Sequence, residues 1–343
     1  KQKTAYDISL GLVGSEMCIR DSLYISHKLE EVRSLCDKAT ILRNGRRVDE
    51  CIPSAETARS LAEKMIGKRV ESVKKRISNE QKSIGLQVSS LTTHSHQPHG
   101  VDLSDIDFEV RAGEIFGIAG IAGNGQIELM DALSGETGAP LAGTIEILGA
   151  DATHLSPNER RELVAVFVTE ERIGQAAVAD MTLVENSFLT APTRMKFSPN
   201  GLIDWNAVGS FADNIVRDFD VRTTGVTALA SSLSGGNLQK FIVGREILQE
   251  PQLLVVSQPT WGVDAGAAAA IHEEIQRLVS AGAAVLVISQ DLDEIFLLSD
   301  QIAVISQGTL SSAAPANDVT PQDIGLLMGV RHTQQEKMKY AAA

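Results

Sequence analysis

The sequence predicts an α/β fold with a mainly parallel sheet covered by helices. Apolar, β-branched runs of strand length lie at 252–257 and 284–289, and segments with helical periodicity separate them. A glycine-dense turn that follows another apolar run opens a helix within residues 113–135. Buried strands that alternate with helices in this way are typical of a parallel sheet between helical layers.

Composition and charge exclude two classes of protein. The 343 residues are 43% hydrophobic and carry 44 acidic against 31 basic side chains, which gives a formal charge of −13. No apolar run approaches the roughly 20 residues of a membrane helix. An acidic chain without a long basic block is also unsuited to neutralising phosphates, so we expect no nucleic-acid partner. Three cysteines without metal-ligand spacing or a disulfide framework favour the cytoplasm, namely Cys18, Cys36 and Cys51.

An internal repeat predicts the domain organisation. LYISHKLEEVRSLCDKATILRNG from Leu23 aligns without gaps with LVISQDLDEIFLLSDQIAVISQG from Leu286, at a constant offset of 263 residues. Each copy predicts a buried strand, an amphipathic helix, a second strand and a glycine turn. We expect a fragment of a longer protein that comprises a remnant of a first domain at 23–73, a linker at 74–83, a complete second domain at 84–332 and a polar tail at 333–343. Residues 1–22 resemble translated adapter sequence, and a genuine strand and turn is the alternative.

The stretch GEIFGIAGIAGNGQIELMDALSG at 113–135 predicts a phosphate-binding loop. Glycines let consecutive N–H groups close around an anion at a helix N-terminus, where the helix dipole favours negative charge. Against G-x-x-x-x-G-K-[ST], Gln126 replaces the lysine and Ile127 the hydroxyl residue, so binding of ATP with Mg²⁺ should be weakened. A tight strand-to-helix turn without a ligand is the alternative. The candidate binding residues are Gly120, Gly123, Asn124, Gly125, Gln126 and Ile127.

A second anion site is predicted at the start of a helix that continues to Leu248. Ser234, Gly235 and Gly236 offer one hydroxyl and several unpaired N–H groups to a γ-phosphate. Taken alone, such a string is an ordinary helix cap. Its position after a phosphate loop and just before a Pro-bounded apolar strand makes it specific.

The predicted catalytic positions mostly hold amides. The strand 252–257 leads into Ser257 and Gln258, where an Asp-Glu pair would hold Mg²⁺ and polarise the attacking water. At one position of the repeat, the first copy has His27 and the second has Gln290. A histidine at a strand end can contact a γ-phosphate and orient water, whereas a glutamine offers only amide hydrogen bonds. An ordinary structural histidine is the alternative for His27, and no metal ligands are predicted.

These motifs, in this order, resemble the ATP-binding-cassette (ABC) family, specifically the double-cassette ATPases of nucleoside and simple-sugar importers. The resemblance covers residues 23–331 and rests on EIFGIAGIAGNGQIEL, HLSPNERREL, LSGGNLQKFIVGREI and QPTWGVDAGA. It implies a P-loop NTPase fold, ATP and Mg²⁺ as cofactors, and a helical subdomain at about 155–230 that docks on transmembrane permease subunits. A substrate-binding lipoprotein is implied as an indirect partner, and the location as peripheral on the inner face of the cell membrane.

The resemblance also assigns roles to single positions. VTEER at 168–172 takes the place of the loop that senses the membrane partner, and Asp264 lies in the D-loop. Ile127 and Trp261 depart from the family pattern.

The family resemblance further implies that the intact and the substituted motifs belong to two different nucleotide sites. ABC cassettes pair head to tail, so each nucleotide lies between the Walker motifs of one cassette and the signature of the other. The intact signature and His27 then face one site, which a missing first cassette completes, and the substituted positions cluster at a degenerate second site. We expect an importer ATPase whose second cassette supplies its signature to the first-cassette site, with this chain alone weakly active or inactive. A non-hydrolysing regulatory or scaffold cassette and a soluble double-cassette ATPase without a transport role are the alternatives.

Other polar clusters are interpreted as structural. His94, His96 and His99 indicate a solvated loop. Arg245 and Glu246 indicate a solvated or domain-packing pair. Charges at helix starts and turns account for Glu170, Glu171, Asp291, Asp293 and Glu294.

Overall fold

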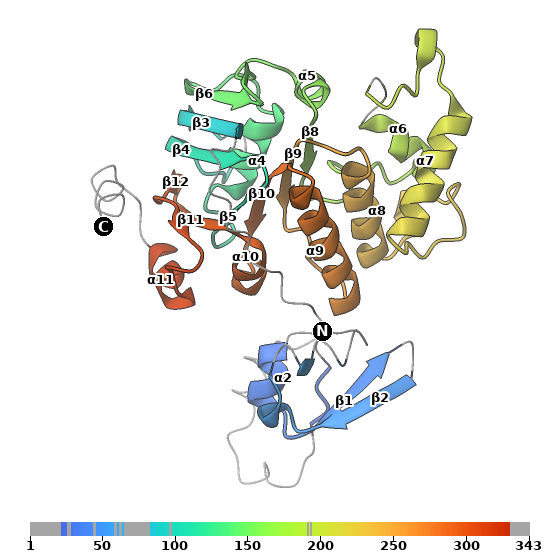
Figure 1. The fold of residues 1–343 in the computed structure, drawn as a ribbon, viewed down its shortest axis with the longest axis vertical. Helices are drawn as coiled ribbons and strands as arrows, with labels where there is room; N and C mark the ends of the chain where they lie inside the picture. The colour runs from blue at the N-terminus through green and yellow to red at the C-terminus, as the bar shows by residue number, and fades with distance from the viewer. Residues whose placement is uncertain are drawn as a thin grey trace. The chain divides into compact units, whose positions relative to one another are not determined.

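The computed structural model describes residues 22–25, 29–43, 46–57, 60–61, 64, 83–95, 98–190, 192 and 194–329. The chain divides into two units, residues 1–75 and 76–343, each of which is described by itself (Figure 1).

In the first unit, the described residues form a short helix and a hairpin. Helix α2 (Leu29–Leu35) precedes strands β1 (Ala39–Arg43) and β2 (Arg46–Cys51), which pair antiparallel, and the 3₁₀ turn η2 (Pro53–Ala55) follows. The second copy of the sequence repeat forms the same succession in the second unit. There, α10 (Leu292–Leu298) precedes β11 (Gln301–Ser306) and β12 (Thr309–Leu310), which are also antiparallel.

The strand predicted at the start of the first copy is wrong. Residues 22–25 are irregular, and Leu23 and Ile25 are 92% and 89% exposed. The matching residues of the second copy lie in β10 (Ala284–Ser289), which is buried between two parallel neighbours. A strand of a parallel sheet depends on neighbours for its hydrogen bonds and on covering layers for its burial. The described part of the first unit contains no parallel sheet that could supply such neighbours, since its two strands form only an antiparallel hairpin.

A mainly parallel sheet forms the core of the second unit, as the sequence predicts. Its order is β12-β11-β5-β10-β9-β8. Strand β10 pairs parallel with β5 (Ile115–Ala119) and β9 (Leu253–Ser257), and β9 pairs parallel with β8 (Ala165–Val168). Strand β11 runs parallel to β5, whereas β12 and β13 (Ala314–Pro315) pair antiparallel with β11. Every residue of β5, β8, β9 and β10 is buried, which explains their continuous apolar character.

The two faces of this sheet pack against different layers (Figure 1). Leu254 and Val256 of β9 join a core with α8 (Gly235–Ile247), α9 (Ala265–Ser280) and α10. Leu253 and Val255 point the other way, toward α4 (Gln126–Ser134) and a second, antiparallel sheet. That sheet has the order β4-β3-β6-β7, from strands β3 (Ile84–Thr93), β4 (Leu103–Arg111), β6 (Ala142–Ile147) and β7 (Ala150–Asp151). One face is therefore covered largely by strands rather than by helices alone.

The middle of the second unit is mostly helical. Helix α5 (Pro157–Glu162) precedes β8, and α6 (Leu183–Leu189) and α7 (Trp205–Asp218) follow it, with the turns η3 (Pro199–Gly201) and η4 (Ala230–Ser232). Capping boxes at Ser156 and Thr182 fix the starts of α5 and α6. Helix α11 (Pro321–Leu327) is the last described element.

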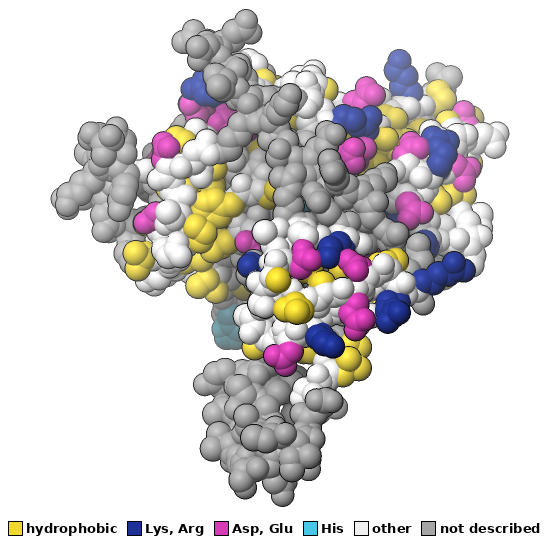
Figure 2. Space-filling view, turned by 60° about the horizontal axis from the view of Figure 1, so that its bottom comes forward, with side chains coloured by type: hydrophobic (Ala, Val, Ile, Leu, Met, Phe, Trp, Pro, Cys, Tyr) yellow, Lys and Arg dark blue, Asp and Glu magenta, His cyan; other side chains and the backbone are white. Residues whose placement is uncertain are grey.

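The described helices and the surface charges show no membrane-spanning segment and no patch of one sign on the face that is drawn. None of the helices in the described ranges combines the length and the apolar character needed to cross a bilayer. On the face shown in Figure 2, the coloured basic and acidic side chains are intermingled rather than gathered into a patch of one sign.

A buried ion network joins the helical region to the sheet. The Glu246 carboxylate of α8 accepts hydrogen bonds from Arg161 Nη1 and Arg245 Nε, each at 2.9 Å. Arg245 also donates to the carbonyls of Asn186 in α6 and of Ala176. Burial alone would raise the pKa of Glu246, but the two guanidinium groups hold this pKa below its ordinary value. Of the two interpretations of Arg245 and Glu246, the packing pair is confirmed and the solvated pair is wrong, since Arg245 and Glu246 are only 1% and 0% exposed.

Replacing the central carboxylate should destabilise the second unit strongly. Glu246→Gln leaves two guanidinium groups without their counter-charge, and we expect the free energy of unfolding to fall by about 3 kcal/mol. Urea denaturation followed by circular dichroism measures this change. In the control Glu274→Gln, a pair with the exposed Arg277 is removed, and a change below about 1 kcal/mol is expected. Equal losses in the two variants would contradict a special role for Glu246.

Candidate functional site

The glycine-rich turn lies at the carboxyl end of β5, where parallel sheets commonly bind ligands. Gly123 and Gly125 have φ of 79° and 113°, a conformation that other residues rarely adopt, and Gly125 caps α4. A Cβ atom at Gly120 would lie 2.6 Å from Gln126 Nε2 and 2.7 Å from the Ile305 side chain. The sequence thus forms the predicted loop, and its glycines are required by backbone conformation and by packing against β11.

Two amide side chains brace this loop from within. Gln126, 4% exposed, donates from Nε2 to the Ile121 carbonyl at 2.8 Å and accepts at Oε1 from the Asn124 N–H at 3.1 Å. Asn124 donates from Nδ2 to the same carbonyl, and its Oδ1 accepts from the N–H of Gln307 at 2.9 Å. The loop is therefore held to the turn between β11 and β12 by neutral groups. The backbone N–H of Asn124 already donates to Gln126 and is not available to a ligand in this arrangement.

The far end of α4 is held by a buried arginine. Arg160, 1% exposed, donates from Nη1 to the carbonyls of Ala132 and Leu133, each at 2.6 Å, and from Nε to the Leu155 carbonyl. Burial lowers the pKa of Arg160 to about 10, so the group stays charged at neutral pH. A positive charge at this end satisfies the last carbonyls and complements the helix dipole.

The predicted second anion site is exposed at the start of α8. Ser234 is the N-cap residue, and its Oγ accepts from Asn237 Nδ2 at 2.9 Å instead of from a backbone N–H. Arg172, the last residue of VTEER, contributes a cation here, which the sequence analysis did not predict. Its Nη2 donates to the Trp261 carbonyl, and a Cβ at Gly235 would lie 2.7 Å from its Nη1.

Gln258 and Gln290 meet at the ends of neighbouring strands β9 and β10. Gln258, 4% exposed and with φ of 51°, accepts at Oε1 from the N–H of Gln290 and from Ser289 Oγ, both at 3.4 Å. His27 lies outside the described residues. Of the three predicted catalytic positions, the structure thus brings two together.

A pocket of about 380 Å³ adjoins the first turns of α4 at the carboxyl ends of β8 and β9. None of the signature residues 234–236 lines it. Burial raises the pKa of Glu170, and burial together with the nearby Glu128 and Glu136 raises the pKa of Asp131. The lining residues are Ile127, Met130, Asp131, Thr169, Glu170, Glu171, Gln175, Ser257 and Trp261.

Solved structures with the same fold are ATP-binding cassettes. The dimeric cassette MJ0796, in a post-hydrolysis state bound to ADP and phosphate, matches with a TM-score of 0.58 at 18% identity and covers 67% of this chain and 98% of its own. A nucleotide-free cassette from an ABC transporter matches with a TM-score of 0.56 at 19% identity, covering 73% and 100%. Residues 103–261, which include the phosphate loop, Ser234 and the end of β9, match the ABC transporter family. The chain carries an ABC transporter domain.

Curated relatives of this ABC chain are import proteins. The nucleoside import ATP-binding protein NupA of Lactococcus lactis subsp. cremoris is 38% identical over 306 residues, or 89% of this chain and 60% of its own length. The guanosine import protein NupO of Bacillus subtilis is 34% identical over 306 residues, covering 89% and 59%. The ribose import protein RbsA of Bacillus licheniformis is 35% identical over 304 residues, covering 88% and 59%. The chain thus spans about three fifths of the length of these relatives.

The ABC cassette has donors for a phosphate but not the usual set for Mg²⁺. The loop ends at Gly125, the N-cap residue of α4, and the N–H groups of a helix N-terminus suit an anion. At the metal position, Ile127 offers no oxygen, while Ser257 and Gln258 offer no charge, and Mg²⁺ prefers carboxylate and water oxygens. Among the described residues, no group of three His, Cys, Asp or Glu side chains is spaced to hold a metal ion.

Glu294 lies in the first turn of α10, as expected for a helix-start charge, but its burial was not predicted. Asp291 caps the helix, and Glu294 is 4% exposed. Its Oε1 accepts from Thr260 Oγ1 at 2.6 Å and pairs with His272 Nε2 at 3.0 Å, and its Oε2 accepts from Ser289 Oγ at 2.7 Å. Burial alone would raise the pKa of Glu294, but these hydrogen bonds keep it below its ordinary value. No spacing rule identifies such a group, because its partners come from three separate segments.

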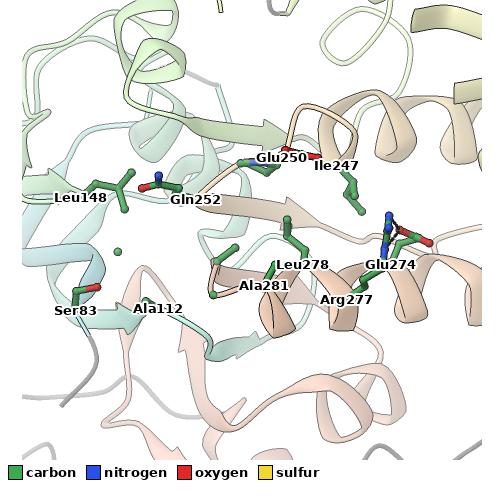
Figure 3. A pocket seen from close by; sticks show the side chains of 14 residues that line it. Ser83, Ala112, Leu148, Ile247, Glu250, Gln252, Glu274, Arg277, Leu278 and Ala281 are labelled. Carbon is green, nitrogen blue, oxygen red and sulfur yellow. Dashed lines mark hydrogen bonds and ion pairs between the residues drawn. The ribbon is translucent and has the colours of Figure 1, made fainter. Parts of the chain in front are cut away.

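A larger pocket of the cassette, about 540 Å³, lies at the opposite edge of the sheet (Figure 3). Its lining includes Ala112, Gln252 and Ala283, which precede the amino ends of β5, β9 and β10. Glu274 and Arg277 at its rim engage each other. Ligands of parallel sheets bind at the carboxyl edge, so we assign this pocket no role in nucleotide binding.

The Glu294 carboxylate should make stability depend on pH. Its folded-state pKa is depressed, so its contribution is present above the unfolded-state pKa, near 4.5, and is lost as the pH falls through the folded-state value. We expect Glu294→Gln to lower the free energy of unfolding by about 2 kcal/mol at neutral pH. Urea titrations at several pH values should show this difference shrinking below pH 4.5.

The exposed Glu273 on the adjacent helix α9 provides the control, because Glu273→Gln should show no such trend. A difference for Glu294→Gln that stays constant into the acid range would mean that the side chain acts by packing and not by charge.

Proposed function

We propose that the chain is the ATP-binding part of an ABC importer for nucleosides or simple sugars. Its relatives over about nine tenths of its length are named as nucleoside, guanosine and ribose import ATP-binding proteins. ATP-binding cassettes in general use ATP with Mg²⁺, and the phosphate loop and Ser234–Gly236 are the parts of this chain suited to that ligand. The transported solute class rests on the relatives alone.

In this proposal, the second cassette supplies its signature to a hydrolytic site completed by a first cassette, and its own site is degenerate. The observation that carries the proposal is a contrast between two anion sites. The start of α8 is exposed, with Ser234 Oγ held by the Asn237 side chain rather than by a backbone N–H, and with a guanidinium beside Gly235. The phosphate loop, by contrast, is closed by the buried amide of Gln126. The repeat at an offset of 263 residues supports a first cassette in the full-length protein.

The partners and location follow from the same proposal. The helical region α6–α7 is the docking surface for transmembrane permease subunits, which hold the protein at the inner face of the cell membrane. A substrate-binding lipoprotein is an indirect partner. Exposed apolar side chains support this docking role, namely Leu189, Leu202, Ile203 and Trp205.

A second candidate function is a regulatory or scaffold cassette that pairs without turnover. The braced loop favours it, because the loop keeps its form through internal hydrogen bonds and without a ligand's charge. In that case neither anion site would matter for ATP hydrolysis.

The two proposals predict different ATPase activities for variants of the full-length protein. If the signature serves the hydrolytic site, Gly235→Asp should lower ATPase activity about 100-fold, since a carboxylate would face the phosphate at a charge-stabilising site. Gln126→Ala should lower it less than tenfold, about 1.4 kcal/mol, because its own site is degenerate. Steady-state phosphate release from purified protein measures the ATPase activity of both variants.

Binding of the intact protein to its permease partners controls for folding in each variant. A larger loss in Gln126→Ala than in Gly235→Asp would contradict the assignment of the degenerate site. Full-length protein without measurable turnover would favour the scaffold function.

A further inference from the structure

The pocket beside the phosphate loop has an unusual charge for a nucleotide site. It lies between the first turns of α4 and the end of β9, where Ser257 stands at a position expected for the acidic pair that holds Mg²⁺ at the phosphates. Three carboxylates line it, those of Asp131, Glu170 and Glu171. No lysine, arginine or histidine is among its lining residues.

One cation lies close to the pocket without being among its lining residues. Arg172 follows these glutamates in the sequence, but its guanidinium donates to the Trp261 carbonyl and lies beside Gly235 at the signature. At the loop itself, the lysine position holds the neutral Gln126. A further phosphate placed toward this pocket would therefore meet three carboxylates and no cationic side chain among the lining residues.

Partial burial makes this repulsion effective. Asp131 and Glu170 are partly withdrawn from water, and their raised pKa values show an environment that already disfavours negative charge. Charges screened less by water interact more strongly. The remaining walls include Ile127 and Met130, which offer no hydrogen-bond donor from their side chains.

We propose that the site at Gly120–Gln126 selects against a terminal phosphate and binds nucleoside diphosphates more tightly than triphosphates. The proposal rests on the proposed function, since it takes the phosphate loop as a nucleotide site. It adds the ligand preference of that site. The second cassette then responds to the ratio of diphosphate to triphosphate, while turnover belongs to the other site.

Calorimetric titration of the 343-residue chain with ADP and with ATP, each with and without Mg²⁺, tests this preference. We expect ADP to bind at least about tenfold more tightly than ATP in both conditions. ATP affinity equal to or above that of ADP, with or without Mg²⁺, would overturn the proposal. Absence of binding by both nucleotides at millimolar concentration would overturn it as well.

A gain-of-affinity variant separates the charge effect from misfolding. Glu170→Gln with Glu171→Gln should raise ATP affinity about tenfold and leave ADP affinity unchanged, because only the triphosphate meets these carboxylates. The matched control is Glu146→Gln with Glu273→Gln, which removes the same charge from exposed positions outside the pocket. An unchanged ratio of ATP to ADP affinity in the first variant, or an equal shift in the control, would overturn the proposal.

These outcomes are distinguishable from failure of the proposed function. Nucleotide preference is measured by binding to this chain, whereas the signature role is measured by turnover of the full-length protein. A site that prefers ATP would leave the ranking of Gly235→Asp and Gln126→Ala untouched.

Discussion

The geometry of the second unit depends on one buried carboxylate. Glu246 lies on α8, accepts hydrogen bonds from Arg161 of α5 and from Arg245 of its own helix, and thereby ties α8 to α5. Arg245 extends the network to α6 through the Asn186 carbonyl. Because α8 begins with Ser234–Gly236, this network also sets where the signature stands relative to the sheet edge. A buried charge thus helps to position the exposed N-terminus of α8.

The phosphate loop shows how a fold can be kept while its chemistry is altered. A lysine in this position would supply charge to a nucleotide, whereas Gln126 supplies two hydrogen bonds to the loop itself. Asn124 adds a link to the turn after β11, and Arg160 secures the opposite end of α4. The strand–loop–helix unit is satisfied internally at both ends. Its shape therefore persists independently of the charge on which tight phosphate binding depends.

The sequence predicted those features that depend on local pattern. Continuous apolar runs identified β9 and β10, and closely spaced glycines identified the loop at 120–125. Features that depend on distant partners were missed: the burial of Glu294, and the reach of Arg172 to Trp261. The strand expected at Leu23–Ile25 did not form, because a parallel strand requires neighbours that periodicity does not report. Pattern thus predicts elements, whereas tertiary contacts decide which charges are buried and which strands persist.

The two tryptophans of the chain provide built-in optical labels. Trp205 begins α7 and packs against Phe188 of α6, with ring centroids 5.9 Å apart. Trp261 stands 60% exposed at the acidic pocket. Indole emission shifts with the polarity of its surroundings, so one label reports on the helical region and the other on the edge of the phosphate loop. Exchange of either one for phenylalanine leaves a single, spatially assigned fluorophore.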